Sequence, residues 1–282
     1  MVAQLLAELR GNPFTLAGAT IVVGLTAVAV VGPLLVPYDP TAQDLANRLH
    51  PPSLAHPLGT DQLGRDVLTR LVYGARISLG IALLVTAIRV AIGTAIGIVS
   101  GYAGGWVDEL LMRLVDVQLA FPGLVLALVV AGILGPSLRN VMIALAVVGW
   151  ATYARVVRGT VLSVKEREYV DASRLLGTPP RRIATRHLLP KVANPVIVLA
   201  TLNLGTVVLA TAGLSFIGLG AQPPTPEWGT MLAGGRDHLR RAWWIVNAPG
   251  IAIMLTVLGF NLLGDGLRDM LDPRQQSRLE EV

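Results

Sequence analysis

The stretch VANPVIVLATLNLGTVVLATAGLSFIGLGAQPPTP, residues 192–226, contains no Asp, Glu, Lys or Arg in 35 consecutive positions. A helix needs about 20 apolar residues to cross the roughly 30 Å hydrocarbon layer of a bilayer, so this stretch is long enough for a transmembrane helix. The Pro-rich sequence at 222–226 cannot continue a helix, because proline lacks the backbone N–H and restricts the residue before it. We therefore expect the helix to end near residues 218–220.

Five further stretches are almost as poor in charge. They are residues 11–38, 77–107, 117–138, 140–154 and 242–264, and Arg89 is the only charged residue in any of them. Four of the five are long enough to cross a bilayer. The shortest reaches that length if its helix continues through Val156 and Val157 and the Arg155 side chain extends to the interface. The sequence therefore predicts an all-α polytopic membrane protein with six transmembrane helices.

The composition supports a membrane protein. Apolar residues make up 53% of the 282 positions and charged residues 15%, whereas soluble domains average about 25% charged residues. Cysteine is absent, which excludes disulfides, thiolate metal sites and a cysteine nucleophile. Nucleic-acid binding would require the basic residues to share one solvated face. The net charge of +5 does not by itself indicate that, and we expect no nucleic-acid partner.

The N-terminal stretch 11–38 is predicted to be an uncleaved membrane anchor. It is too long for the apolar region of a secretory signal, and a Pro-rich turn at 36–40 follows it instead of a small-residue cleavage site. We divide the chain into residues 1–72, with the anchor helix and an external segment, and residues 73–282, with a five-helix core and a long polar loop at 159–191.

Basic residues in the loops predict the orientation. An even number of helices puts both termini on one side. That side carries 14 of the 23 Lys and Arg residues and the other side eight, while Arg89 lies within a predicted helix. Because positive loops stay inside, both termini and the loop at 155–191 are expected to face the cytoplasm.

The loop at 155–191 is the most unusual segment, with nine basic and three acidic residues. Residues 168–176 are predicted to form a short helix, with Gly177 as its left-handed C-terminal cap. Thr178 is expected to cap a second short helix that starts at Pro179.

Pro190 and Pro195 are expected to mark the return of this loop to the bilayer. Two short helices then meet at a rigid elbow, which is a surface suited to docking a soluble partner. The alternative is that the basic residues only anchor the topology and contact anionic lipid.

Residues within this loop resemble the motif of a known family. Asp171-Ala172-Ser173, followed by Gly177 and then by 189–190 (Leu-Pro), is similar in residue type and spacing to the cytoplasmic EAA loop of ABC importer permeases. The sequence departs from that pattern at three positions, where Asp171 replaces Glu, Ser173 replaces the second Ala and His187 replaces Ile. The first two replacements keep the charge and the small size.

Other segments resemble the C-type permeases of the dipeptide, oligopeptide and nickel subfamily, over about residues 12–274. They are 56–61 with 64–66, 74–79, 214–220 with 222–225, and 264–269. The resemblance implies a type I ABC importer permease fold in a prokaryotic inner membrane. It also implies four kinds of partner: a second homologous permease subunit, two ATPase subunits, an external substrate-binding protein and the lipid bilayer.

In such a complex, the helix at 171–177 is the coupling helix that sits in a groove on the ATPase and moves with it. The residues to which the resemblance assigns ATPase coupling are Asp171, Ala172, Ser173, Leu176, Gly177, Leu189 and Pro190. The implied function is ATP-driven import of di- or oligopeptides. A nickel or metal-chelate importer is the alternative.

The energy source is expected in another chain. A P-loop needs Gly-x-x-x-x-Gly-Lys-Ser/Thr, but the only two lysines, Lys165 and Lys191, follow Val164 and Pro190. We therefore expect a transport subunit that is not itself an enzyme and has no cofactor, with ATP and Mg bound by the partner ATPase subunits.

No group of residues indicates catalysis or a metal site. The four histidines lie in predicted loops, and no predicted helix carries two acids at metal-binding or acid–base spacing. Ser215 is followed by Phe216, where intramembrane serine proteases carry Gly. An ion-coupled secondary transporter or channel is the better rival class. Such a protein would place ionisable residues within the membrane, and here only Arg89 lies within a predicted span.

Arg89, Asn203 and Asn261 are candidates for lining the translocation path. Arg89 would either attract a substrate carboxylate, or pair with a backbone carbonyl or a partner subunit. The two Asn residues would either line the path or form interhelical hydrogen bonds.

Two further patterns predict local structure. Glycines at every fourth position, Gly93, Gly97, Gly101 and Gly105, predict a close helix contact, either within the chain or with the second permease. Residues 61–71 are predicted to form an external amphipathic helix with Asp61 as its cap. With residues 221–249, this helix would contact the binding protein or stabilise the outer rim.

Overall fold

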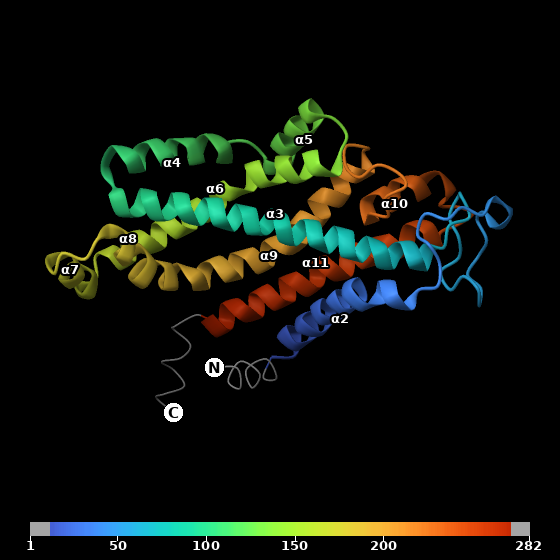
Figure 1. Cartoon of the computed structure of the whole chain (residues 1–282), viewed down its shortest axis with the longest axis horizontal. Coiled ribbons are helices and arrows are strands. Elements are labelled where there is room, and N and C mark those ends of the chain that lie inside the picture. Colours follow the sequence, from blue (N-terminus) through green and yellow to red (C-terminus); the bar gives the residue numbers. More distant parts are fainter. Residues whose placement is uncertain (1–11, 272–282) are drawn as a thin grey trace.

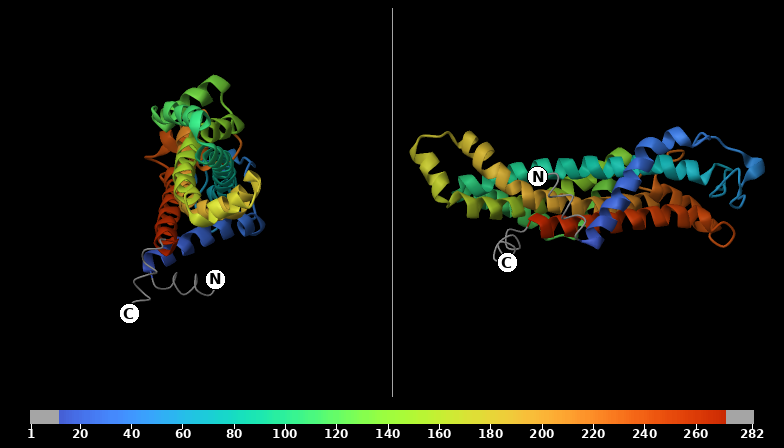
Figure 2. Two further views of the ribbon diagram at one scale, coloured as in Figure 1. Left: turned by 90° about the vertical axis from the view of Figure 1, so that its left-hand side faces the viewer. Right: turned by 90° about the horizontal axis from the view of Figure 1, so that it is seen from below.

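The computed structural model describes residues 12–271, an elongated helical bundle with no strand in this range (Figure 1). In chain order the helices are α2 (Pro13–Leu35), α3 (Val67–Ala103), α4 (Gly105–Leu119), α5 (Gly123–Leu134), α6 (Leu138–Lys165), α7 (Glu168–Leu175), α8 (Pro180–Ile183), α9 (Leu189–Phe216), α10 (Trp228–Gly235) and α11 (Trp244–Leu271). Short 3₁₀ turns lie at Leu45–Asn47 and Arg236–His238, and a π-helical turn lies at Ala184–Leu188. α7 lies at one end of the bundle, and the loop at 36–66 lies at the other (Figure 2).

Five segments are long and apolar enough to cross a membrane: α2, α3, α6, α11 and the continuous helix Pro180–Phe216. The candidate for a sixth span is different, because α4 and α5 pass the same test only together and meet at an angle of 87°. The prediction of one helix over residues 117–138 is therefore wrong. Pro122 stands at the break as the N-cap of α5, where its missing N–H and its ring prevent α4 from continuing.

The first helix packs against the last. α2 begins after Asn12, whose side-chain oxygen accepts a hydrogen bond from the N–H of Phe14 at 3.0 Å. At Gly18 the two helices touch so closely that a Cβ atom would lie 2.6 Å from the backbone nitrogen of Leu263 on α11. The anchor is thus attached to the core.

α3 runs without a break through residues 72 and 73, where the sequence was divided into two parts.

The loop before α3 folds differently from the prediction. Asp66 caps α3, and its carboxylate accepts a hydrogen bond from the N–H of Thr69 at 2.7 Å. The amphipathic helix expected over residues 61–71 does not form. Asp61 is instead buried, and it accepts hydrogen bonds from the backbone N–H of Arg65 at 3.0 Å and from its Nε at 2.6 Å. A buried carboxylate needs such partners, so Asp61 organises a turn instead of starting a surface helix.

α3 packs most extensively on α6, along the face of α3 that carries the spaced glycines. A Cβ atom at Gly97 would lie 2.7 Å from the carbonyl oxygen of Ala154, and Gly93 and Gly101 approach α6 as closely. The close contact predicted from the glycine spacing is confirmed, and it lies within this chain. Gly105 is not part of it, because it begins α4 with a φ of +55° and a Cβ atom there would meet nothing within 4 Å.

Two ion pairs fasten α4 to α6. Arg158 donates from Nε and Nη2 to the two carboxylate oxygens of Asp108, both at 2.6 Å. Nearer the break, Nη2 of Arg155 donates to Asp116 at 2.5 Å. These pairs hold α4 along α6 as far as the sharp turn into α5.

Replacing Gly97 with Val tests the α3–α6 contact. The added side chain would overlap the carbonyl oxygen of Ala154, so we expect a loss of roughly 1–3 kcal/mol of stability, the usual cost of overpacking. Gly80→Val on the same helix is the matched control, because a Cβ atom there meets nothing within 4 Å. The measurement is thermal unfolding of the detergent-solubilised protein. We expect only Gly97→Val to lower the midpoint, and equal midpoints would contradict the contact.

Candidate functional site

The polar loop after α6 folds as a short helix that ends in a left-handed glycine. α7 carries Asp171, Ala172 and Ser173, and its bounds agree with the predicted 168–176 to within one residue. Gly177 has a φ of +72°, as predicted, and its N–H donates to the carbonyl oxygen of Arg174 at 2.9 Å. A Cβ atom on Gly177 would meet nothing within 4 Å, so within this chain the need for glycine is conformational and not steric.

The start of the next helix differs from the prediction. Thr178 does not cap it, since Pro179 occupies the N-cap position, α8 begins at Pro180, and no side chain accepts a hydrogen bond from its first turn. Because Pro179 and Pro180 have no N–H, the donors nearest to the Thr178 hydroxyl are missing.

Pro190 does not break the helix that returns to the bilayer. α8 continues through the π-helical turn at Ala184–Leu188 into α9, so Pro180–Phe216 is one helical segment. The π-helical turn is wider than an α-helical turn, which accommodates the ring and the missing N–H of Pro190, at the second position of α9. The bend of the elbow therefore lies at Gly177, and the chain beyond Pro180 is helically continuous with the span that follows.

Contacts with neighbouring helices hold α7 in place. Oγ of Ser173 lies 3.2 Å from Nε2 of His187, and the Arg174 guanidinium lies over the Tyr102 ring at 5.3 Å from its centroid. Ser173 and His187 are two of the three positions at which the sequence departs from the EAA pattern. Their contact shows that the two departures occur at one place in the structure.

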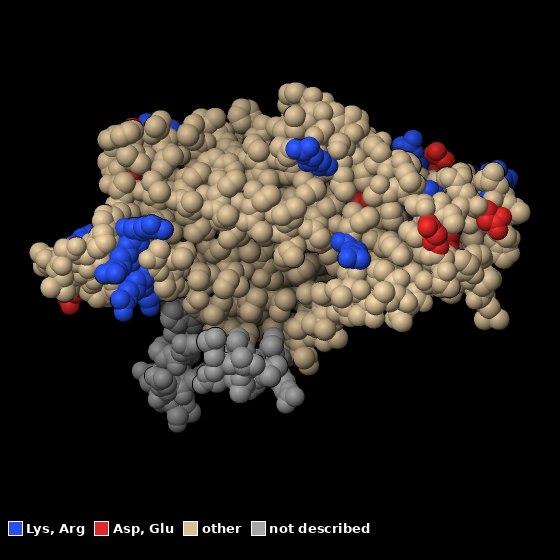
Figure 3. Space-filling view, in the orientation of Figure 1, with Lys and Arg blue, Asp and Glu red and all other residues tan. Residues whose placement is uncertain are grey.

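The tip of the elbow exposes apolar side chains. Leu175 and Leu176 are 90% and 85% exposed, and Asp171, Ala172 and Gly177 are exposed beside them. Basic side chains gather at this end of the molecule (Figure 3), where the exposed arginines Arg181, Arg182 and Arg186 follow the bend. Exposed leucines next to a basic patch are typical of a surface that binds another protein.

The seven predicted coupling residues do not all lie on this tip. Ser173 is half-buried against His187, whereas Leu189 and Pro190 are exposed on the first turn of α9, beyond the π-helical turn. The structure therefore separates the seven residues into two groups. Five lie within 171–177, on α7 and at the bend after it, and Leu189 and Pro190 begin α9.

A second candidate site is an open cavity of about 390 Å³ lined by α3, α6, α9 and the α4–α5 break. Arg89 and Asn203 both line this cavity, whereas Asn261 lies on α11 and is not among its lining residues. The Asn203 amide nitrogen donates to the carbonyl oxygen of Leu199 at 2.9 Å, a bond within its own helix. Two of the three predicted path residues therefore come together.

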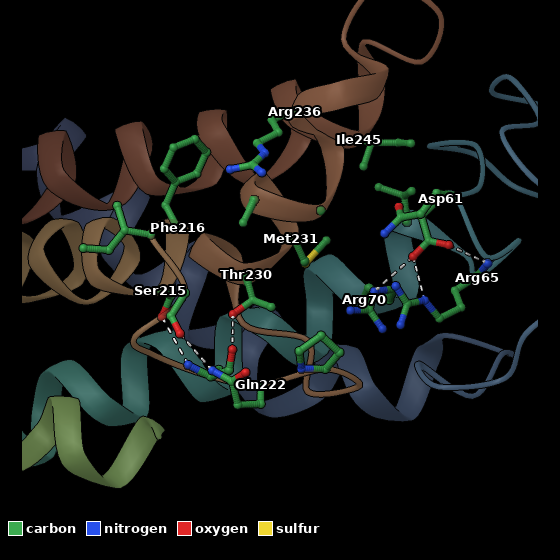
Figure 4. Close-up of a pocket in the computed structure, with 18 residues that line it drawn as sticks. Asp61, Arg65, Arg70, Ser215, Phe216, Gln222, Thr230, Met231, Arg236 and Ile245 are labelled. Atoms are coloured by element: carbon green, nitrogen blue, oxygen red, sulfur yellow. Dashed lines mark hydrogen bonds and ion pairs between the residues drawn. The ribbon is translucent and has the colours of Figure 1, made fainter. Parts of the chain in front are cut away.

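A third hollow, of about 410 Å³, lies at the end of the bundle opposite α7 (Figure 4). Asp61 lies there between Arg65, at 2.6 Å, and Arg70, at 3.6 Å. Nη1 of Arg70 also donates to the carbonyl oxygens of Pro40 at 2.7 Å and Pro224 at 3.2 Å. Protein groups thus satisfy these buried charges, so we interpret the cluster as a structural tie between two loops.

Two residues of the membrane cavity were missed by the sequence analysis. Gly149 on α6 lies against Arg89, and a Cβ atom there would be 2.2 Å from Cζ of the guanidinium. Gln118 lines the cavity from the last turn of α4, and its Oε1 is buried without a hydrogen-bond partner among the described residues. No local sequence signal marks either residue, because only the packing of α3, α4 and α6 brings them together.

The sequence matches two family descriptions. "Binding-protein-dependent transport system inner membrane component" matches residues 93–277, and "N-terminal TM domain of oligopeptide transport permease C" matches residues 3–52.

Individual relatives align along nearly the whole chain. The dipeptide transport system permease protein DppC of Alkalihalophilus pseudofirmus is 44% identical over 270 residues, covering 96% of this chain and 89% of that protein. The di/tripeptide transport system permease protein DppC of Pseudomonas aeruginosa is 45% identical, with 93% and 89% covered. The glutathione transport system permease protein GsiD of Escherichia coli is 43% identical, with 94% and 88% covered.

A solved structure shows the same fold. A chain of the MetNI methionine ABC transporter, in an inward-facing conformation, superposes with a TM-score of 0.58 at 19% identity. The superposition covers 72% of this chain and 96% of that one. The arrangement of candidate membrane spans and the sequence matches point to the same family. The chain is a multi-span membrane protein that belongs to the family of binding-protein-dependent transport system inner membrane components, the permeases of ABC importers.

Proposed function

We propose that this chain is one permease subunit of an ATP-driven importer of di- and oligopeptides. Relatives at 43–45% identity are described as permeases for dipeptides, di- and tripeptides and glutathione, which supports short peptides as the substrate class. Family membership also favours an ATP-driven importer over an ion-coupled secondary transporter or a channel.

The working complex contains more chains than this one. An external binding protein delivers the substrate, a second homologous permease subunit completes the path, and two ATPase subunits bind ATP and Mg. The missing P-loop supports a separate ATPase. The excess of basic loop residues supports an orientation with α7 and both termini in the cytoplasm.

The main support for a coupling role is the exposed apolar tip of α7, Leu175 and Leu176, which lies at the bend formed by Gly177. α6 leads into the bend, and the continuous helix Pro180–Phe216 leads away from it. Movement of a protein bound at Leu175 and Leu176 would therefore act on two membrane spans at once. Leu175 and Leu176 are adjacent and almost fully exposed, so together they offer apolar surface to a partner chain.

Replacing Gly177 tests the bend. Valine at a φ of +72° costs about 1–2 kcal/mol, so the turn should rearrange in Gly177→Val. We expect uptake of dialanine by the assembled transporter to fall roughly tenfold while the amount of protein in the membrane is unchanged. Gly177→Asn is the matched control and should retain more uptake, since Asn tolerates the left-handed region. Full uptake by Gly177→Val would show that the bend is not needed for coupling.

Replacing the exposed leucines tests docking. Leu175→Glu combined with Leu176→Glu puts two charges at the tip, and we expect the double variant to co-purify with much less ATPase subunit than the wild type. Leu54→Glu is the control, because Leu54 is fully exposed in the loop at the opposite end of the bundle. Subunit ratios after affinity purification provide the measurement. Equal ATPase recovery for all three proteins would refute docking at α7.

A further inference from the structure

Arg89 is a buried cation without a carboxylate partner in the described part of the chain. It lies in the middle of α3 and is only 8% exposed. Its Nε donates to the carbonyl oxygen of Leu145 on α6 at 2.8 Å, and its two terminal nitrogens make no hydrogen bond to any described residue. The ion pairs among residues 12–271 all involve other residues.

The structure holds this guanidinium in a defined position. A Cβ atom at Gly149 would lie 2.0 Å from Nε and 2.2 Å from Cζ of Arg89, so only glycine leaves room for the group against α6. Because the backbone of α6 both admits the side chain and accepts its Nε hydrogen, Arg89 cannot move freely. The terminal nitrogens that remain are the part of the group available to a ligand.

The cavity beside Arg89 contains further polar groups but no acid. Gln118, Thr152, Asn203 and Thr206 line it, and Phe121 contributes from the α4–α5 break. Oε1 of Gln118 is a buried acceptor that lacks a donor among the described residues. A volume of about 390 Å³ lies within the usual range of sites for small ligands, roughly 300–1,000 Å³.

An unpaired charge in a region of low dielectric constant is costly, and intramembrane arginines therefore pair with a carboxylate, a backbone carbonyl or a ligand. Here one carbonyl satisfies Nε alone. The remaining donors of a guanidinium match the two oxygens of a carboxylate. We propose that Arg89 binds the free carboxylate of the transported molecule. This inference rests on the proposed function, in which the transported molecule is a short peptide.

Single-cysteine labelling tests the charge preference of the cavity. The chain has no cysteine, so Thr152→Cys, at an exposed position on the cavity wall, introduces one thiol. In the assembled transporter, the thiol is treated with anionic sulfonatoethyl methanethiosulfonate or cationic trimethylammonioethyl methanethiosulfonate, and the mass of this chain reports the labelling rates. Adding Arg89→Met should lower the anionic-to-cationic rate ratio roughly tenfold, since a fixed unit charge is removed. Arg139→Met, at an exposed position outside the cavity, is the control.

Protection from labelling tests the ligand. Dialanine should slow the labelling of the Thr152→Cys protein at least roughly threefold, a modest effect for one charge-assisted contact. Dialanine amide, which lacks the carboxylate, should have little effect. In the Arg89→Met background neither compound should protect, whereas Arg139→Met should behave like the parent protein.

The outcomes separate this inference from the proposed function. An unchanged rate ratio in Arg89→Met, or equal protection by dialanine and its amide, would overturn the inference even if the transporter imports dialanine. Protection by neither compound would also overturn it, because it would indicate that a carboxylate of a partner chain occupies Arg89. A charge preference and protection by dialanine without any dialanine uptake would support the carboxylate site and contradict peptide import.

Discussion

The close contact between α3 and α6 is the interaction on which the rest of the structure depends. Three glycines on α3 let the backbones approach so closely that a methyl group at any of them would overlap α6. This contact places Arg89 on α3 beside Gly149 on α6, and it also holds the span that leads into α7. The cavity beside Arg89 and the elbow at Gly177 therefore both depend on α6 and its packing against α3.

The elbow consists of one left-handed turn between two continuous helices. Gly177 supplies the left-handed turn, whereas α6 on one side and Pro180–Phe216 on the other are continuous helices. With the π-helical turn at Ala184–Leu188, that second segment stays helical through Pro190. Because packed helices move as units, such an arrangement suits the transfer of a displacement from the tip to the membrane.

The break between α4 and α5 shows how irregular backbone is accommodated in this helical bundle. Lipid offers no hydrogen bonds, so backbone that leaves the helical ladder must be covered by protein or must line a cavity. The break between α4 and α5 does the second of these, since Leu119, Phe121 and Gly123 line the cavity that contains Arg89. The two ion pairs to α6 hold α4 in place up to this point.

The sequence by itself determined the apolar spans, the short helix before Gly177 and the glycine face of α3, because each follows from local composition, length or spacing. The 87° break at Pro122 and the helix that passes Pro190 were not predicted, since the same residue type can end a helix or be accommodated within one. Only the tertiary structure decided which residues meet, as it placed Gly149 and Gln118 beside Arg89 and left Asn261 elsewhere. The physical reason is that such contacts depend on how each helix is rotated and crossed within the bundle, and packing of all the helices sets those angles.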